Sequence, residues 1–225
     1  LPSSLSVVGG APKMPSVVKR LVRACRRANR RLLPFQTVER IRARVCPITG
    51  GAHYGDIKVS SMRRVRRRVA KHTGLDPDTD ELVDVGCGIG RWLLAASRRV
   101  RYVAGIEYLP ERAAIAHEIV PSAAVFCADA TEEWTPWLDG TTHVLCYDLM
   151  FTDQQRQAVL DRALEHDRVR CVVLWSRTAV PGFEHVDTVP TRTPAGEAYD
   201  CSVRRPTTSR TAATPYAACR HRRRH

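Results

Sequence analysis

The sequence lacks any uninterrupted apolar run of about 18 residues, so it contains no candidate for a membrane-spanning helix. Its eight cysteines never form a C-x-x-C pair, the spacing that zinc clusters use, and we therefore predict no metal site. Four cysteines lie in apolar, strand-like stretches, where buried thiols are expected, and such thiols favour a reducing compartment. These four are Cys87, Cys127, Cys146 and Cys171.

Acidic side chains are almost absent from the two ends of the chain. Residues 1–38 carry eight basic side chains and no acidic one, and residues 201–225 carry seven and none. Residues 39–74 are also basic, with a net charge of +8, whereas residues 75–200 have a net charge of −10. The basic parts could hold a polyanion and the acidic body could receive a basic substrate. The alternative is a pair of solvated basic tails on an ordinary acidic domain.

Residues 81–96 combine a short apolar run with closely spaced glycines. Residues 82–85 have the length of a buried strand, and Gly86, Gly88 and Gly90 follow at every second position. An apolar stripe at helical spacing comes next. This order predicts a strand, a tight turn and a helix whose free N–H groups face a ligand. A tight turn without a ligand would use the same residues.

The glycine spacing helps to identify that ligand. A dinucleotide fingerprint is G-x-G-x-x-G, but here the third glycine comes one residue early and Arg91 stands in its place. A dehydrogenase is therefore disfavoured. Asp84, two residues before the first glycine, is badly placed for a pyrophosphate and well placed for a cationic ligand.

Further strands and helices alternate along the acidic body. Apolar runs predict strands, and the 3.6-residue period, the caps and the prolines predict helices between them. Acidic residues stand at four successive strand ends, where open α/β sheets bind ligands. We therefore expect an α/β fold with a mostly parallel sheet, helices on both faces and a C-terminal antiparallel hairpin. The predicted strands are 82–85, 100–107, 123–128, 142–147 and 169–175, the hairpin pairs 183–190 with 197–204, and helices cover 60–72 and begin at Trp92, Pro110 and Thr152.

The pattern D-x-G-x-G-x-G, from Asp84 to Gly90, resembles the first motif of class I S-adenosylmethionine (SAM) methyltransferases. The resemblance implies a Rossmann-like fold with SAM as the cofactor. Glu107 is where a doubly wound fold places the carboxylate that binds ribose hydroxyls. In the methyltransferase pattern, Asp129-Ala130 meets the adenine amino group, although Asp129 could equally cap a helix over 131–138.

Two further segments resemble the non-SET histone-lysine methyltransferases, the disruptor-of-telomeric-silencing family. His53-Tyr-Gly-Asp56 is similar to its Y-G-E segment, and the segment from Tyr147 to Asp153 is similar to its N-N-F-A-F-G-P segment. The resemblance covers roughly residues 46–178. The sequence departs from the family pattern at two positions, where Tyr147 and Asp148 stand in place of the family's two asparagines.

This second resemblance implies a lysine of a nucleosomal histone as the methyl acceptor. Tyr147, Asp148 and Phe151 would then line the acceptor channel, with Asp148 orienting the amine or taking its proton and Phe151 excluding water. The cofactor site would comprise Tyr54, Gly55, Asp56, Asp84, Gly86, Gly88, Gly90, Glu107, Asp129 and Ala130.

The basic segments would hold nucleosomal DNA in that interpretation, and the protein would act in the nucleus. A basic amphipathic helix near the N-terminus would equally suit RNA, an anionic membrane surface or organelle targeting. The predicted contacts to nucleic acid are Lys19, Arg20, Arg23, Arg26, Arg27, Arg30, Arg31, Arg63, Arg64, Arg66, Arg67 and Arg68.

We therefore predict a basic extension over residues 1–45, a methyltransferase domain over 46–204 and a disordered basic tail over 205–225. One alternative is a methyltransferase that acts on RNA or on a small molecule. The other is a nucleic-acid-binding protein that retains a vestigial cofactor fold. Substrate preference would separate the first alternative from the histone interpretation, and failure to bind SAM would favour the second.

Overall fold

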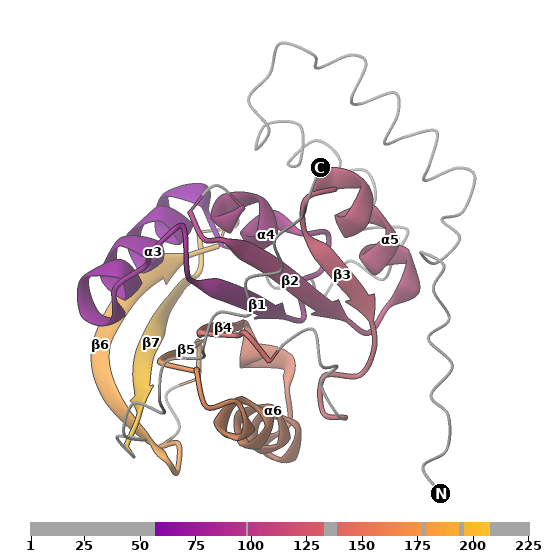
Figure 1. Cartoon of the computed structure of the whole chain (residues 1–225). Helices are drawn as coiled ribbons and strands as arrows, with labels where there is room; N and C mark the ends of the chain where they lie inside the picture. The colour runs from indigo at the N-terminus through magenta and orange to yellow at the C-terminus, as the bar shows by residue number, and fades with distance from the viewer. Residues whose placement is uncertain (1–56, 98, 133–138, 177–178, 194–195, 208–225) are drawn as a thin grey trace, which may run out of the picture.

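The computed structural model describes residues 57–97, 99–132, 139–176, 179–193 and 196–207. The predicted helix within residues 1–45, the segment from Tyr54 to Asp56 and the basic tail lie outside these residues. Helices and strands alternate in the described part, as the sequence predicts (Figure 1). They are α3 (Val59–Thr73), β1 (Glu81–Val85), α4 (Arg91–Ala96), β2 (Tyr102–Glu107), α5 (Pro110–Ile119), β3 (Ala124–Cys127), β4 (His143–Cys146), η3 (Asp148–Met150), α6 (Asp153–Glu165), β5 (Cys171–Leu174), β6 (Phe183–Arg192) and β7 (Ala198–Pro206).

The seven strands form one sheet in the order β3-β2-β1-β4-β5-β7-β6. The first five run parallel, and β7 enters antiparallel between β5 and β6. Val85 pairs with both Ile106 and Cys146, and Glu107 pairs with Cys127, so the carboxyl ends of β1 to β4 meet at one edge. We call this the active edge. The predicted α/β fold with its C-terminal antiparallel hairpin is confirmed.

Helices cover both faces of the sheet, as expected from strands that are buried on both sides. On one face α3, α4 and α5 pack over the sheet, and α3 lies along β6 (Figure 1). On the other face, in the described part of the chain, the helix α6 contributes side chains to the core. Val159, Leu160 and Ala163 of α6 are buried there against β4 and β5.

The helix α3 follows its sequence pattern closely. Met62, Val65 and Val69 are buried at helical spacing, and Gly74 ends the helix with a positive φ of 69°. Four arginines on the opposite face are exposed and form what we call the α3 ridge. They are Arg63, Arg64, Arg67 and Arg68, while Arg66 is half-buried.

Several local predictions hold and two do not. The capping box at Thr152 and Gln155 begins α6 as predicted. Cys127 is exposed, contrary to the prediction, because it ends the edge strand β3. Pro190 lies inside β6 and not in the turn. An edge strand tolerates proline because the missing N–H can fall on the side that has no neighbouring strand.

Within the described part of the chain, no helix is long and apolar enough to span a membrane. The same residues contain no cluster of three or more metal-binding side chains.

Candidate active site

A cavity of about 480 Å³ opens at the active edge, above the carboxyl ends of β1, β2 and β3. Five residues predicted from the glycine motif and the strand ends contribute to its walls, and so do two of the three predicted for the acceptor channel. These seven are Gly86, Gly88, Glu107, Asp129, Ala130, Tyr147 and Phe151. The sequence therefore predicts the location of this cavity and half of its wall.

The glycine turn forms the floor of the cavity. Gly86 and Gly88 have φ of 71° and 56°, a left-handed conformation that residues with a Cβ rarely adopt. The Phe151 ring lies over Gly86, since a Cβ there would meet its Cε1 and Cζ atoms at 3.9 Å. The turn thus brings bare backbone against the cavity and an aromatic ring closes one side.

Gly90 has a different place from the one predicted. It does not line the cavity but precedes α4 with φ of 82°, and a Cβ there would meet the Ala116 Cβ at 3.2 Å. Its small size lets α4 pack closely on α5. Gly90 therefore serves the helix packing behind the site and does not form its wall.

Glu107 is held rigidly at the end of β2. Its Oε2 accepts a hydrogen bond from the Gly88 backbone N–H at 2.8 Å, and its Oε1 accepts one from Leu109 N–H at 3.0 Å. The side chain is only 6% exposed, yet it lines the cavity. Each oxygen keeps a further lone pair for a ligand hydroxyl, and the two backbone bonds fix the direction of both.

Asp84 lies beneath the glycine turn and does not line the cavity itself. It is 3% exposed, and its Oδ2 has no hydrogen-bond partner among the described residues. Burial raises the pKa of Asp84 well above its usual range, and the neighbouring Glu107 carboxylate raises it further. Burial therefore favours the protonated carboxyl, and a cationic partner would stabilise its ionised form.

Asp129 is exposed at the end of β3, and its Oδ1 accepts hydrogen bonds from the backbone N–H and the hydroxyl of Thr131. It therefore caps its own turn, and it also lines the cavity. Residues 133–138, where a helix was predicted, lie outside the described part of the chain.

Asp148 has partners that differ from the predicted acceptor amine. It is completely buried, and its Oδ2 accepts a hydrogen bond from Arg156 Nε at 2.6 Å. Its Oδ1 accepts bonds from the backbone N–H groups of Trp175 and Ser176, at 2.7 and 3.0 Å. This carboxylate joins β4, α6 and the end of β5, and it has no surface from which to take a proton from a substrate.

Tyr147 and Phe151 remain at the acceptor side of the cavity. Burial raises the pKa of Tyr147 to about 12, and Tyr199, Glu197 and Asp148 raise it as well. The phenol therefore keeps its proton at neutral pH. Its ring packs on Trp175 with a centroid distance of 5.1 Å, so the wall behind it is aromatic.

Two wall residues that sequence reasoning missed are the large apolar side chains Tyr108 and Met150, which are 70% and 58% exposed. Exposed apolar surface beside a cavity marks a place where a ligand can cover it. Tyr108 directly follows Glu107 at the end of β2, a position that could have predicted it. The remaining missed wall residues are Ile106, Arg112, Ala128, Thr131 and Gln155.

Most of the residues that form this site lie within a stretch of the sequence that matches a known protein family. Residues 82–168 match the family model described as a methyltransferase domain. The chain carries a class I SAM-dependent methyltransferase domain. No curated protein sequence matches the chain.

Solved methyltransferase structures share the fold of this domain. N-methyltransferase NodS from Bradyrhizobium japonicum WM9, in complex with S-adenosyl-L-homocysteine, has a TM-score of 0.52 and 12% identity, with coverage of 66% of this chain and 86% of NodS. Magnesium protoporphyrin IX methyltransferase from Synechocystis PCC 6803, with bound S-adenosyl-L-homocysteine, has a TM-score of 0.51 and 14% identity, with coverage of 68% and 90%.

SAM is the cofactor of the domain, and the residues present fit it. Asp84 lies directly beneath the glycine turn, where the positive charge of bound SAM would stabilise its ionised form, and the Glu107 carboxylate would accept hydrogen bonds from the ribose hydroxyls. Tyr108, Met150 and Phe151 line the cavity and would supply apolar surface for the adenosine. When bound, SAM supplies a methyl group on a sulfonium.

Proposed function

We propose that this methyltransferase transfers methyl groups to an amine of a basic protein, and that a lysine of a nucleosomal histone is the acceptor. The observation that carries the proposal is the surrounding of Tyr147, which lines the cavity beside Phe151, packs on Trp175 and lies near the exposed carboxylate of Glu197. An acidic and aromatic acceptor side attracts a cationic side chain. The resemblance of residues 46–178 to the non-SET histone-lysine family supports the choice of acceptor.

In this proposal the described residues position the amine and exclude water. The neutral Tyr147 hydroxyl can accept a hydrogen bond from the amine, Phe151 lines a dry approach, and Trp175 packs behind Tyr147. A dry environment lowers the pKa of a lysine and so favours loss of its proton. Asp148 has a supporting role, since its bonds to Trp175 and Ser176 hold the end of β5 against β4.

The α3 ridge supports nucleic acid as the carrier of the acceptor. Partial burial lowers the pKa of Arg66, and the nearby positive charges of Arg99, Arg63 and Arg67 lower it further. The helix also begins at the active edge, because Lys58 N–H donates to Arg192 O at 2.7 Å and Arg91 Nη1 donates to Ile57 O at 3.0 Å. A polyanion along α3 would therefore reach the edge of the sheet at which the cavity opens. A nuclear location would follow from a nucleosomal partner.

The acceptor is tested by transfer of labelled methyl groups from SAM to intact nucleosomes, free histones and total RNA in parallel. We expect label on a nucleosomal histone and little on free histones, since DNA contacts contribute to binding. Label on RNA alone would establish the second candidate, an RNA methyltransferase, for which the α3 ridge is equally suited. SAM binding without transfer to any of the three would contradict the proposed acceptor.

The role of the α3 ridge is tested with the Arg63→Gln/Arg67→Gln variant. Removing two phosphate contacts should reduce the slope of log affinity against log salt by about 1.8 for DNA, and SAM binding should be unchanged. The matched control is Arg162→Gln/Arg205→Gln, which removes the same charge from arginines paired with Glu165 and Glu184. An equal loss in both variants would indicate a net-charge effect and contradict the α3 interface.

A further inference from the structure

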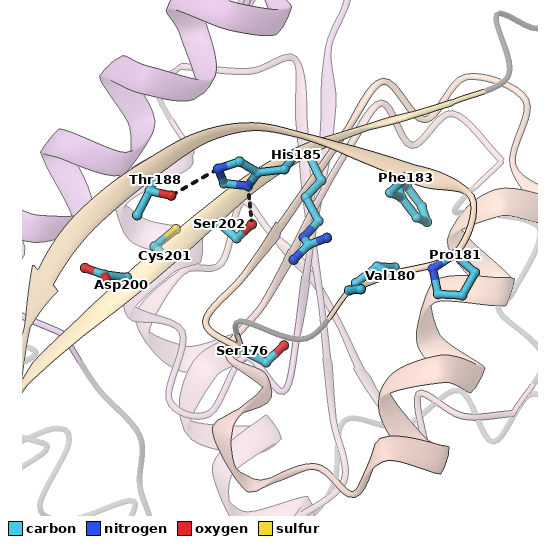
Figure 2. A pocket seen from close by; sticks show the side chains of 11 residues that line it. Ser176, Val180, Pro181, Phe183, His185, Thr188, Asp200, Cys201 and Ser202 are labelled. Atoms are coloured by element: carbon cyan, nitrogen blue, oxygen red, sulfur yellow. Dashed lines mark hydrogen bonds between the residues drawn. The ribbon is translucent and has the colours of Figure 1, made fainter.

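A second, larger cavity of about 780 Å³ lies on the α6 side of the β6–β7 hairpin (Figure 2). Between the end of β5 at Leu174 and the start of β6 at Phe183, the described residues contain no helix. We call this cavity the hairpin groove. Its walls are formed by Ser176, Ala179, Val180, Pro181, Phe183, His185, Thr188, Asp200, Cys201, Ser202 and Arg204.

The hairpin groove has an apolar part and a polar part. In Figure 2 the side chains of Val180, Pro181 and Phe183 gather at one end, and His185, Thr188 and Ser202 form the polar wall. A cavity of this size with few convergent polar groups is typical of small-molecule sites.

The polar wall contains at least one hydroxyl that can donate to a ligand. His185 Nδ1 is 3.0 Å from Ser202 Oγ, and His185 Nε2 is 3.0 Å from Thr188 Oγ1. A neutral imidazole donates through one nitrogen only. The hydroxyl that receives this N–H keeps its own hydrogen available for a ligand acceptor.

Arg204 adds a positive charge to the same wall. It pairs with His185 across the hairpin, and its side chain is 6% exposed while lining the groove. Burial lowers the pKa of Arg204 and the charge of Asp148 raises it, and a ligand anion in the groove would favour the charged form further.

Ser176 supplies an independent sign that a ligand is bound here. Its side chain is 8% exposed, and its Oγ is buried without a hydrogen-bond partner among the described residues. Its backbone N–H is fixed by Asp148, so the residue is held in place at the wall of the groove. A buried hydroxyl without a partner costs free energy unless a ligand or water satisfies it.

We propose that the hairpin groove binds a small organic anion, whose carboxylate or phosphate contacts Arg204, Ser176 and the His185 hydroxyl pair. The apolar body of the ligand covers Val180, Pro181 and Phe183. This site is separate from the cofactor cavity, with Asp148 and its partners between the two. It does not depend on the proposed histone acceptor.

The test is isothermal titration of the full chain with octanoate, octyl phosphate, octylamine and octanol, which share one apolar body. We expect saturable binding of the two anions and much weaker binding of the amine and the alcohol. The stronger of the two anions identifies the head group as carboxylate or phosphate. Equal binding of all four would indicate apolar contact alone and would overturn the proposal.

Two variants place the anion in the groove. Arg204→Gln should weaken anion binding at least about tenfold, because it removes a charge-assisted bond. Ser176→Ala should weaken it several-fold without loss of stability, since it removes only an unpartnered hydroxyl. The control is Arg205→Gln, the neighbouring exposed arginine that pairs with Glu184, which should bind the anions as the wild type does. SAM binding, measured in each variant, reports that the fold is intact, and unchanged anion binding in Ser176→Ala and Arg204→Gln would overturn the proposal.

Discussion

The Asp84→Asn variant should bind SAM at least about 30-fold more weakly than the wild type, while its cofactor-free form becomes more stable. The affinity loss follows from removing a buried charge that pairs with the cationic end of the cofactor, an effect of about 2–5 kcal/mol. The gain in stability follows from removing a buried carboxylate that has no hydrogen-bond partner on Oδ2 among the described residues. Calorimetry with SAM and thermal unfolding without it measure the two effects.

The pH dependence of the unfolding free energy tests the predicted gain in stability independently. The folded-state pKa of Asp84 is raised above its ordinary value of 3.8. The stabilisation from the protonated carboxyl is therefore full below that value and is lost as the pH rises through the raised pKa. The amide side chain of the variant cannot ionise, so the cofactor-free variant should lack this loss and should differ most from the wild type above the raised pKa.

SAM binding should show the opposite trend in the wild type. The cationic ligand favours the ionised carboxylate, so SAM affinity should rise with pH through the raised pKa, and the variant should lose this dependence. The control is Asp161→Asn on the exposed face of α6, which should alter neither affinity nor stability by more than about 0.5 kcal/mol. SAM affinity within threefold of the wild type in Asp84→Asn would show that another group binds the cation.

The sequence predicts the fold well because its signals are local. The buried stripe of α3, the capping box at Thr152 and the glycine turn at Gly86 and Gly88 each depend on neighbouring residues. The register of parallel strands then brings Glu107 and Asp129 to one edge. Local periodicity together with the topology of an open α/β sheet therefore locates the cavity.

The direction of a side chain at a strand end depends on distant residues, and there the sequence fails. Glu107 ends the buried strand β2 and Asp148 comes shortly after the buried strand β4, yet Glu107 faces the cofactor cavity and Asp148 turns inward. Asp148 turns inward because its carboxylate accepts hydrogen bonds from Arg156, eight residues further along, and from two backbone N–H groups that are 27 and 28 residues away. The position of Gly90 behind the site could not be predicted for the same reason, since the Ala116 side chain that it packs against belongs to another helix.

The Asp148→Asn variant should lose about 3 kcal/mol of unfolding free energy. The substitution leaves Arg156, which is 9% exposed, without its buried anionic partner, and breaking such a pair costs about 3–5 kcal/mol. The loss should appear as a lower midpoint in urea with an unchanged m-value. Methyl transfer by the variant should fall in proportion to the folded fraction.

Asp153 provides a matched control for this prediction, because it bonds the same arginine from an exposed position. The side chain of Asp153 is 90% exposed, so Asp153→Asn should cost less than about 1 kcal/mol. The double variant Asp148→Asn/Arg156→Gln should be less destabilised than the sum of its single variants, since neither then leaves a buried charge unpaired. A fully stable Asp148→Asn protein with normal SAM affinity and no methyl transfer would instead show that Asp148 acts directly on the acceptor, contrary to its buried position.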